Sequence, residues 1–128
     1  MTYGDMRRAI TGMPVTVASA LLPDGMCGAY DNETRVILID RRLTYASKRC
    51  TLMHEMIHWW HGDSSCNPHS RAKNEYRTRH QTALLLIDPI EYATLERMYE
   101  GDAWHMAAEL GVTVQVIRDY QDTLSQCA

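Results

Sequence analysis

The chain lacks the two segments that would mark a membrane or exported protein: a long apolar run and an apolar stretch after its first charges. Its longest uninterrupted apolar run covers residues 83–87, whereas a bilayer-spanning helix needs about 20 such residues. The opening "MTYGDMRRAI" is not followed by the apolar region of a secretion signal. We therefore expect a cytoplasmic protein with no membrane partner.

The chain also lacks closely spaced cysteines and an excess of basic residues. Its cysteines, Cys27, Cys50, Cys66 and Cys127, form no CxxC pair, which excludes the usual zinc-ribbon and thioredoxin-like motifs. We expect free thiols in a reducing compartment. A formal net charge of -3 and a pI of about 6.0 argue against a general nucleic-acid-binding surface.

Phenylalanine is absent as well, and the eight methionines are expected to fill core space in its place. A chain of 128 residues with 45% hydrophobic content can bury a sizeable core, so we expect one domain over residues 1–128. The expected elements, in chain order, are helix 5–10, strands 14–22, 27–30 and 35–40, and helices 47–62, 70–87, 90–99, 103–110 and 113–124. This order predicts an α+β fold, with a small N-terminal antiparallel sheet of about three strands followed by a histidine-rich helix and several packed helices.

The histidine-rich helix contains "TLMHEMIHWWHGD" at residues 51–63. His54 and His58 lie four positions apart, with Glu55 directly after the first histidine. On a helix the two histidines are about 40° apart, so both imidazoles can meet one ion. The opposite side of the helix, which should anchor it to the core, carries Met53, Met56, Ile57 and Trp60.

Two imidazoles and a carboxylate suit Zn²⁺, which in catalytic sites keeps one coordination position open. Glu55 is too close along the chain to bind the ion together with both histidines. It would take a proton from the attacking water and pass it to the leaving amine, as in the HExxH motif of metalloproteases. The alternative is a solvated histidine-rich face without a metal, and His61, near His54 on the helix wheel, fits that alternative.

A third metal ligand is expected on the next helix, where Glu75 follows His58 by seventeen residues. The alternative role for Glu75 is an exposed carboxylate paired with Arg71 or Arg79 on its own helix. Other candidates for the third ligand, each less suited by position, are His61, Asp63, His69 and His80. His80 and Tyr76 are also considered as donors to the oxygen that becomes negatively charged during peptide hydrolysis.

Together these segments resemble the ImmA/IrrE family of small zinc metallopeptidases from bacteria, phages and mobile elements. The resemblance covers residues 15–124 and rests on "GAYDNETRVILID", "TLMHEMIHWWHGD", "NEYRTRHQTALLLIDP" and "AAELGVTVQVIRDYQDTL". It implies His54, His58 and Glu75 as zinc ligands and Glu55 as the general base. The family's second helix usually carries an acidic-Ala-x-x-Phe-Ala pattern, from which the basic "EYRTRHQTALLL" departs.

The resemblance also implies an activity and a partner. Family members cleave a transcriptional repressor, often one with a helix-turn-helix, and so relieve repression of a phage, a mobile element or stress genes. The chain would then be a zinc endopeptidase with a protein substrate. An extended peptide would lie against an edge strand of the sheet, for which residues 35–40 are the candidate.

A rival interpretation is a regulator that binds DNA through a helix-turn-helix at residues 103–124, with Thr113, Gln115 and Arg118 facing the major groove. Acidic residues around this segment oppose contact with phosphates, so direct nucleic-acid binding is not expected; they are Glu109, Asp119 and Asp122. A further alternative is an inactive interaction module. Glu55 argues against it, because only the chemistry requires that residue.

Overall fold

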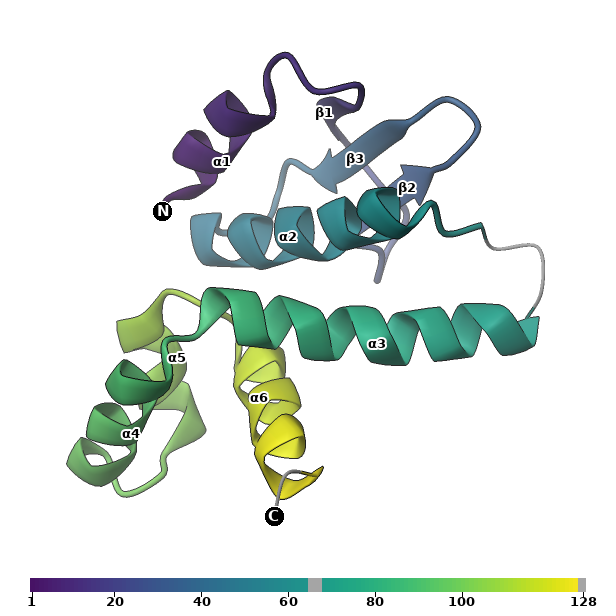
Figure 1. Cartoon of the computed structure of the whole chain (residues 1–128). Helices are drawn as coiled ribbons and strands as arrows, with labels where there is room; N and C mark the ends of the chain where they lie inside the picture. The colour runs from purple at the N-terminus through teal and green to yellow at the C-terminus, as the bar shows by residue number, and fades with distance from the viewer. Residues whose placement is uncertain (65–67, 127–128) are drawn as a thin grey trace.

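The computed structural model describes residues 1–64 and 68–126, and Cys66 and Cys127 lie outside these ranges. The elements are α1 (Tyr3–Ile10), β1 (Thr16–Ala20), β2 (Gly28–Asp31), β3 (Val36–Asp40), α2 (Tyr45–His61), α3 (Pro68–Leu86), α4 (Pro89–Met98), α5 (Ala103–Leu110) and α6 (Val114–Gln126). Figure 1 shows α1 and the sheet on one side of α2, and the remaining helices on the other. The expected α+β order is confirmed. No helix in the described part combines the length and apolarity that crossing a membrane requires.

The sheet is mixed, so the expectation of a wholly antiparallel sheet is wrong. Its strand order is β1-β3-β2; β2 pairs with β3 in antiparallel register, while β1 pairs with β3 in parallel. The physical reason is the dense apolar run in β3, whose Ile37 and Ile39 are fully buried. The most apolar strand takes the central place. Residues 35–40 therefore form no edge strand, and the edge beside α2 is β2.

Helix α2 begins one turn before the expected Ser47. Its N-cap is Thr44, whose hydroxyl accepts a hydrogen bond from the Ser47 amide. The helix ends, as expected, at Gly62, which adopts the left-handed conformation at φ 63°. Leu52 and Ile57 are buried, but Trp60, expected on the anchoring face, is 77% exposed. The anchoring side turns toward the sheet, where Met53, Met56 and Trp59 pack instead.

Helix α3 is the long element that separates α2 from the C-terminal helices (Figure 1). It starts two residues before the expected Ser70. The expected apolar stripe holds only at its end, because Ala83 and Ile87 are buried, whereas Ala72, Tyr76 and Leu84 are exposed. The helix packs on both α2 and α6, so its contact surfaces include Thr78 and Thr82, polar side chains that are buried.

Two apolar clusters hold these layers together. One contains residues of α1, the sheet and α2, with Ile37, Ile39 and Leu52 at its centre. The other joins the end of α3 to α4, α5 and α6 and includes Met106 and Ile117. Helix α2 is therefore held from the sheet side and from the helical side, and the face between them carries the histidines.

Candidate metal centre

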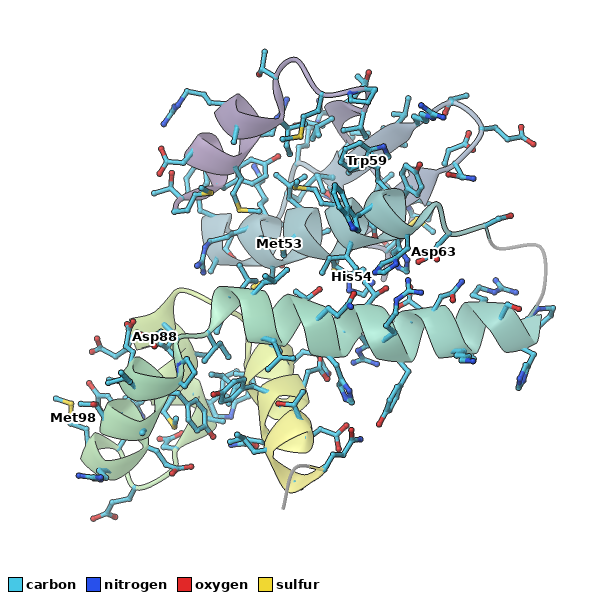
Figure 2. All side chains as sticks on the ribbon, viewed as in Figure 1. Met53, His54, Trp59, Asp63, Asp88 and Met98 are labelled. Atoms are coloured by element: carbon cyan, nitrogen blue, oxygen red, sulfur yellow. The ribbon has the colours of Figure 1, made fainter. Side chains whose placement is uncertain are left out.

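Helix α2 presents His54, Glu55 and His58 toward the groove between α2 and α3. Glu55 and His58 are buried, and His54 is partly buried. Figure 2 shows His54 and Asp63 on the side of α2 that faces α3. The rings of His54 and His58 meet edge to face, with centroids 4.8 Å apart, as the four-residue spacing predicts.

Helix α3 runs beneath α2 and brings Glu75 to the two histidines. Glu75 Oε1 lies 2.7 Å from His58 Nε2, and Glu75 Oε2 lies 3.2 Å from His54 Nε2. The two Nε2 atoms are 3.2 Å apart. Within the described part of the chain these three side chains form a group that could hold a metal ion, with one ligand atom from each, all within 4.8 Å of one another.

The other ring nitrogen of His58 is held by Asp63. His58 Nδ1 lies 2.8 Å from Asp63 Oδ2, and Arg77 contacts the same carboxylate oxygen. The left-handed Gly62 makes this contact possible: it turns the chain back so that the Asp63 amide donates to the carbonyl of His58 at 3.0 Å. A carboxylate that orients a metal-binding histidine in this way is a common second partner.

The ligand atoms of His54, His58 and Glu75 are suited to binding a cation. An ionised carboxylate can only accept a hydrogen bond, so the proton shared between His58 and Asp63 lies on Nδ1, and Nε2 of the neutral ring has a lone pair. Nε2 lies against the Glu75 carboxylate, to which it donates while it carries a proton, so a cation that replaced this proton would be held by Nε2 and Glu75 together. Ligands about 2.1 Å from a tetrahedral ion lie about 3.4 Å from one another, close to the spacings between these atoms. Zinc therefore suits the three side chains.

The acidic surroundings shift the protonation of these groups. Burial lowers the pKa of His58, but hydrogen bonds with Glu75 and Asp63 outweigh it and leave the pKa raised. Hydrogen bonds from His54 and His58 hold the pKa of Glu75 well below its usual range. The same negative environment that favours a proton on the His58 imidazole also favours a metal cation.

Glu55 lies beside the cluster without joining it. Burial raises the pKa of Glu55, the neighbouring His54 and His58 lower it, and Glu75 raises it further; the net shift is upward. A carboxylate with a raised pKa is a stronger base near neutral pH. The HExxH pattern predicts a general base at Glu55, and the raised pKa is compatible with that role.

Strand β2 approaches α2 closely at Gly28. A Cβ atom at this position would lie 2.5 Å from Thr51 Cγ2 and 3.0 Å from the Leu38 carbonyl oxygen, and 3.4 Å from Glu55 Cγ. Only glycine allows this distance without displacement. The absent side chain thus sets the separation between the edge strand and the helix that carries the cluster.

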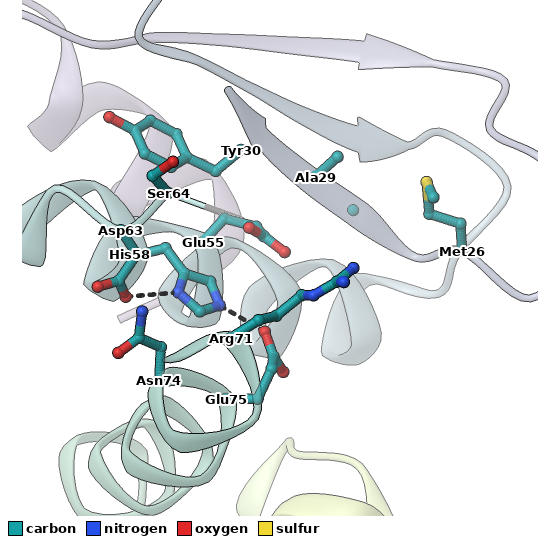
Figure 3. A pocket seen from close by; sticks show the side chains of 11 residues that line it. Met26, Ala29, Tyr30, Glu55, His58, Asp63, Ser64, Arg71, Asn74 and Glu75 are labelled. Carbon is teal, nitrogen blue, oxygen red and sulfur yellow. Dashed lines mark hydrogen bonds and ion pairs between the residues drawn. The ribbon is translucent and has the colours of Figure 1, made fainter. Parts of the chain in front are cut away.

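Two cavities flank the cluster. One, of about 310 Å³, is bordered by Glu55, His58 and Glu75 (Figure 3). The other, of about 570 Å³, is bordered by His54, Glu55 and Glu75 and extends to α6. Gly28 borders both cavities. The cluster therefore lies between two open spaces that share the start of β2.

The match to a known family follows this geometry. The IrrE N-terminal-like domain, Peptidase_M78, matches residues 11–119. The chain belongs to this family of ImmA/IrrE metallopeptidases. The resemblance seen in the sequence is thereby confirmed, and in this Peptidase_M78 chain the His54–His58–Glu75 group is the candidate metal site.

A solved structure shares the fold of this M78 domain. It is a Mycobacterium tuberculosis transcriptional regulator, with a TM-score of 0.68 and 12% sequence identity. The match covers 91% of this chain but only 39% of that protein. At this identity the likeness concerns the fold alone. No curated protein matches the sequence significantly.

Two other candidate residues of the M78 chain, Tyr76 and His80, border a further cavity of about 300 Å³ together with Glu75. His80 Nε2 lies 2.6 Å from Asp122 Oδ2, and the Tyr76 ring contacts His80 at a tilt of 56°, with centroids 4.3 Å apart. Neither residue borders the two cavities beside the cluster. Their expected role as donors to the developing oxyanion stays a prediction. His61 Nε2 lies 3.0 Å from Gln81 Oε1, and His69 is exposed near the start of α3.

Sequence reasoning missed two positions. It considered Asp63 as a metal ligand, whereas the structure makes Asp63 the partner of His58 Nδ1; Gly62 as a helix stop was the available signal, because a left-handed glycine reverses the chain. It considered Arg71 only as an ion-pair partner of Glu75. The structure instead places Arg71 in the lining of the cavity of about 310 Å³.

Proposed function

We propose that the chain is a zinc-dependent endopeptidase whose active site is the His54–His58–Glu75 cluster with Glu55 beside it. The observation that carries the proposal is the convergence of two imidazole nitrogens and one carboxylate, next to a buried glutamate of raised pKa. Membership of the Peptidase_M78 family implies a metallopeptidase. The two arguments are independent, because one rests on geometry and the other on sequence similarity.

Each residue has a defined task in the proposed reaction. His54, His58 and Glu75 would hold the metal, and Asp63 would keep His58 Nε2 available by accepting a hydrogen bond from Nδ1–H. Zinc with three protein ligands supplies a Lewis acid with an open coordination position. Glu55 would remove a proton from the attacking water and later donate it to the nitrogen of the departing amine.

Strand β2 is the proposed support for the substrate. Within the described residues β2 pairs only with β3, so the other edge of β2 is open. Gly28, Ala29 and Tyr30 border the same cavity as Glu55 and His58. A peptide that pairs with this edge would be held by main-chain hydrogen bonds and would pass the cluster in an extended form.

We further propose that the substrate is a transcriptional repressor. The family resemblance supports this choice. The rival DNA-binding role fits less well, because Thr113 and Gln115 border the cavity that contains His54 and Glu55. Asp119, on the same helix, is paired with Arg79 at 3.5 Å.

The proposal is tested by incubating the zinc-loaded chain with helix-turn-helix repressors encoded near its own gene. Cleavage sites are identified by mass spectrometry. We expect cleavage by the parent chain and by a Glu91→Gln control, which removes an exposed carboxylate of α4. Glu55→Gln should keep zinc and lose cleavage, by about 100-fold or more. Undiminished cleavage by Glu55→Gln would show that Glu55 is not the general base.

A further inference from the structure

Arg71 borders the cavity of about 310 Å³ beside the cluster. It lies four residues before Glu75 on α3, so both side chains point from the same face of the helix. The lining of this cavity includes three acidic residues, Glu55, Asp63 and Glu75. Arg71 is the one Lys or Arg among the described lining residues, and it lies one helical turn before Glu75 on α3.

Two of the three acidic groups of this cavity are engaged by neighbouring cations or imidazoles, whereas Glu55 is buried beside them. Asp63 is bound by His58 and Arg77, and Glu75 by the two histidines. Arg71 makes no ion pair with any carboxylate in residues 1–64 and 68–126. Arg79, two turns further along the same helix, does have a carboxylate partner, Asp119. The cavity therefore contains one guanidinium whose charge is not matched within the described structure.

The guanidinium of Arg71 extends over the cavity, away from α3 (Figure 3). Ala29 and Tyr30 of β2 border the opposite side of the same cavity. A peptide lying along the open edge of β2 would pass between this strand and Arg71. One of its side chains would then project toward the guanidinium, because side chains alternate between the two faces of an extended peptide.

We propose that Arg71 selects substrates with an acidic side chain next to the peptide bond that is cut. This inference rests on the proposed peptidase function and adds a substrate class to it. A guanidinium binds a carboxylate through two parallel hydrogen bonds, which no neutral side chain can match in both charge and geometry. A main-chain carbonyl could accept a hydrogen bond from Arg71, but it would leave the charge unmatched.

The test compares cleavage of a peptide mixture prepared from a bacterial proteome by the zinc-loaded parent, Arg71→Gln and Arg71→Glu. The control is Lys73→Gln, which removes a positive charge from an exposed position of the same helix that does not border the cavity. Cleavage sites are read by mass spectrometry, and zinc content is measured for all four proteins. Equal zinc content shows that each variant retains the cluster.

We expect the parent and Lys73→Gln to prefer Asp or Glu over Asn or Gln, by about tenfold, at one fixed position within two residues of the cut bond. Arg71→Gln should lose this preference, and Arg71→Glu should favour Lys or Arg at the same position.

Two results would overturn the role of Arg71 while leaving the peptidase proposal intact. One is cleavage by the parent without an acidic preference, or with a preference that Arg71→Gln retains. The other is an equal loss of cleavage of acidic and neutral peptides in Arg71→Gln, which would assign Arg71 to the peptide backbone instead. Absence of any cleavage by the zinc-loaded parent would contradict the peptidase proposal itself, and the acidic selection with it.

Discussion

At the residue scale, the candidate metal site is formed by side chains that contact one another. The local part of this arrangement is readable from the sequence, because four-residue spacing on a helix always places two side chains together. His54 and His58 were predicted from that spacing, with Glu55 between them. The partner of His58 Nδ1 was not predicted, since Asp63 reaches His58 only through the left-handed turn at Gly62. That turn depends on backbone geometry beyond the motif.

Asp63 is predicted to strengthen metal binding without touching the metal. Replacing it with alanine removes the acceptor that keeps the proton on His58 Nδ1. We expect Asp63→Ala to bind zinc about 10- to 100-fold more weakly, as measured by competition with a chromophoric chelator. Asp24→Asn, in the turn before β2, is the control and should bind zinc as the parent does. Equal affinity of Asp63→Ala and parent would refute the orienting role.

Asp40, at the end of β3, is predicted to make stability depend on pH. Its carboxylate accepts hydrogen bonds from the Arg42 side chain and amide, which hold the Asp40 pKa well below its usual range. A depressed folded-state pKa means that this stabilisation is complete above the unfolded pKa of about 3.9 and is lost as pH falls below it. Asp40→Asn should lower Tm at pH 7.

The difference in Tm between the parent and Asp40→Asn should narrow as pH is lowered from 5 toward 2, where the parent carboxyl approaches protonation. Thermal unfolding followed by circular dichroism measures this difference. A gap in Tm that stays constant over this range would show that the charge of Asp40 contributes nothing to folding.

Elements bring together what local patterns cannot. Glu75 was predicted because a helix that follows α2 after a short loop can return along it, and α3 does so. The strand order was not predictable in the same way. Pairing of β1 with β3 depends on contacts between distant segments, and the apolar run of β3 is equally compatible with a hairpin edge. The expected substrate strand therefore had to be replaced by β2.

The spacing between β2 and α2 is predicted to depend on Gly28. In Gly28→Ala the new Cβ would meet Thr51 Cγ2 and the Leu38 carbonyl, so the strand must move from the helix. We expect a loss of about 1–3 kcal/mol in the free energy of unfolding, measured with urea. Gly4→Ala in α1 is the control, because its Cβ would have no contact closer than 3.7 Å.

Adding Thr51→Ser to Gly28→Ala removes the nearest methyl group and should restore part of that stability. Unchanged stability of the single variant Gly28→Ala would show that β2 can shift at no cost. The close approach would then play no part in positioning Glu55.

At the scale of the whole molecule, the C-terminal helix α6 borders the cavity of about 570 Å³ beside the cluster. The sequence pattern of residues 103–124 fits a helix-turn-helix, and the structure does form two helices there, α5 and α6. Their placement was not predictable, because it depends on how α6 packs against α3. In that arrangement Thr113 and Gln115 border the cavity beside His54. The sequence alone does not distinguish residues that would contact DNA from residues that line this cavity.

We therefore predict that the chain does not bind DNA. Its net charge of -3 and the pairing of Asp119 with Arg79 leave the α6 surface without a cluster of cations for phosphates. An electrophoretic shift assay at about 50 mM salt, with operator DNA from the chain's own locus, should give no complex. A specific complex that Arg118→Gln abolishes would instead support the DNA-binding role.

The central claim is that His54, His58 and Glu75 bind one zinc ion, and elemental analysis of untagged protein tests it most directly. The parent, His54→Ala, Glu75→Ala and the Glu91→Gln control are purified in parallel, supplied with zinc and freed of excess metal. We predict about one zinc per chain in the parent and control and a large loss in the other two. A parent that remains free of zinc, or that keeps equal zinc in all four proteins, would contradict the assignment.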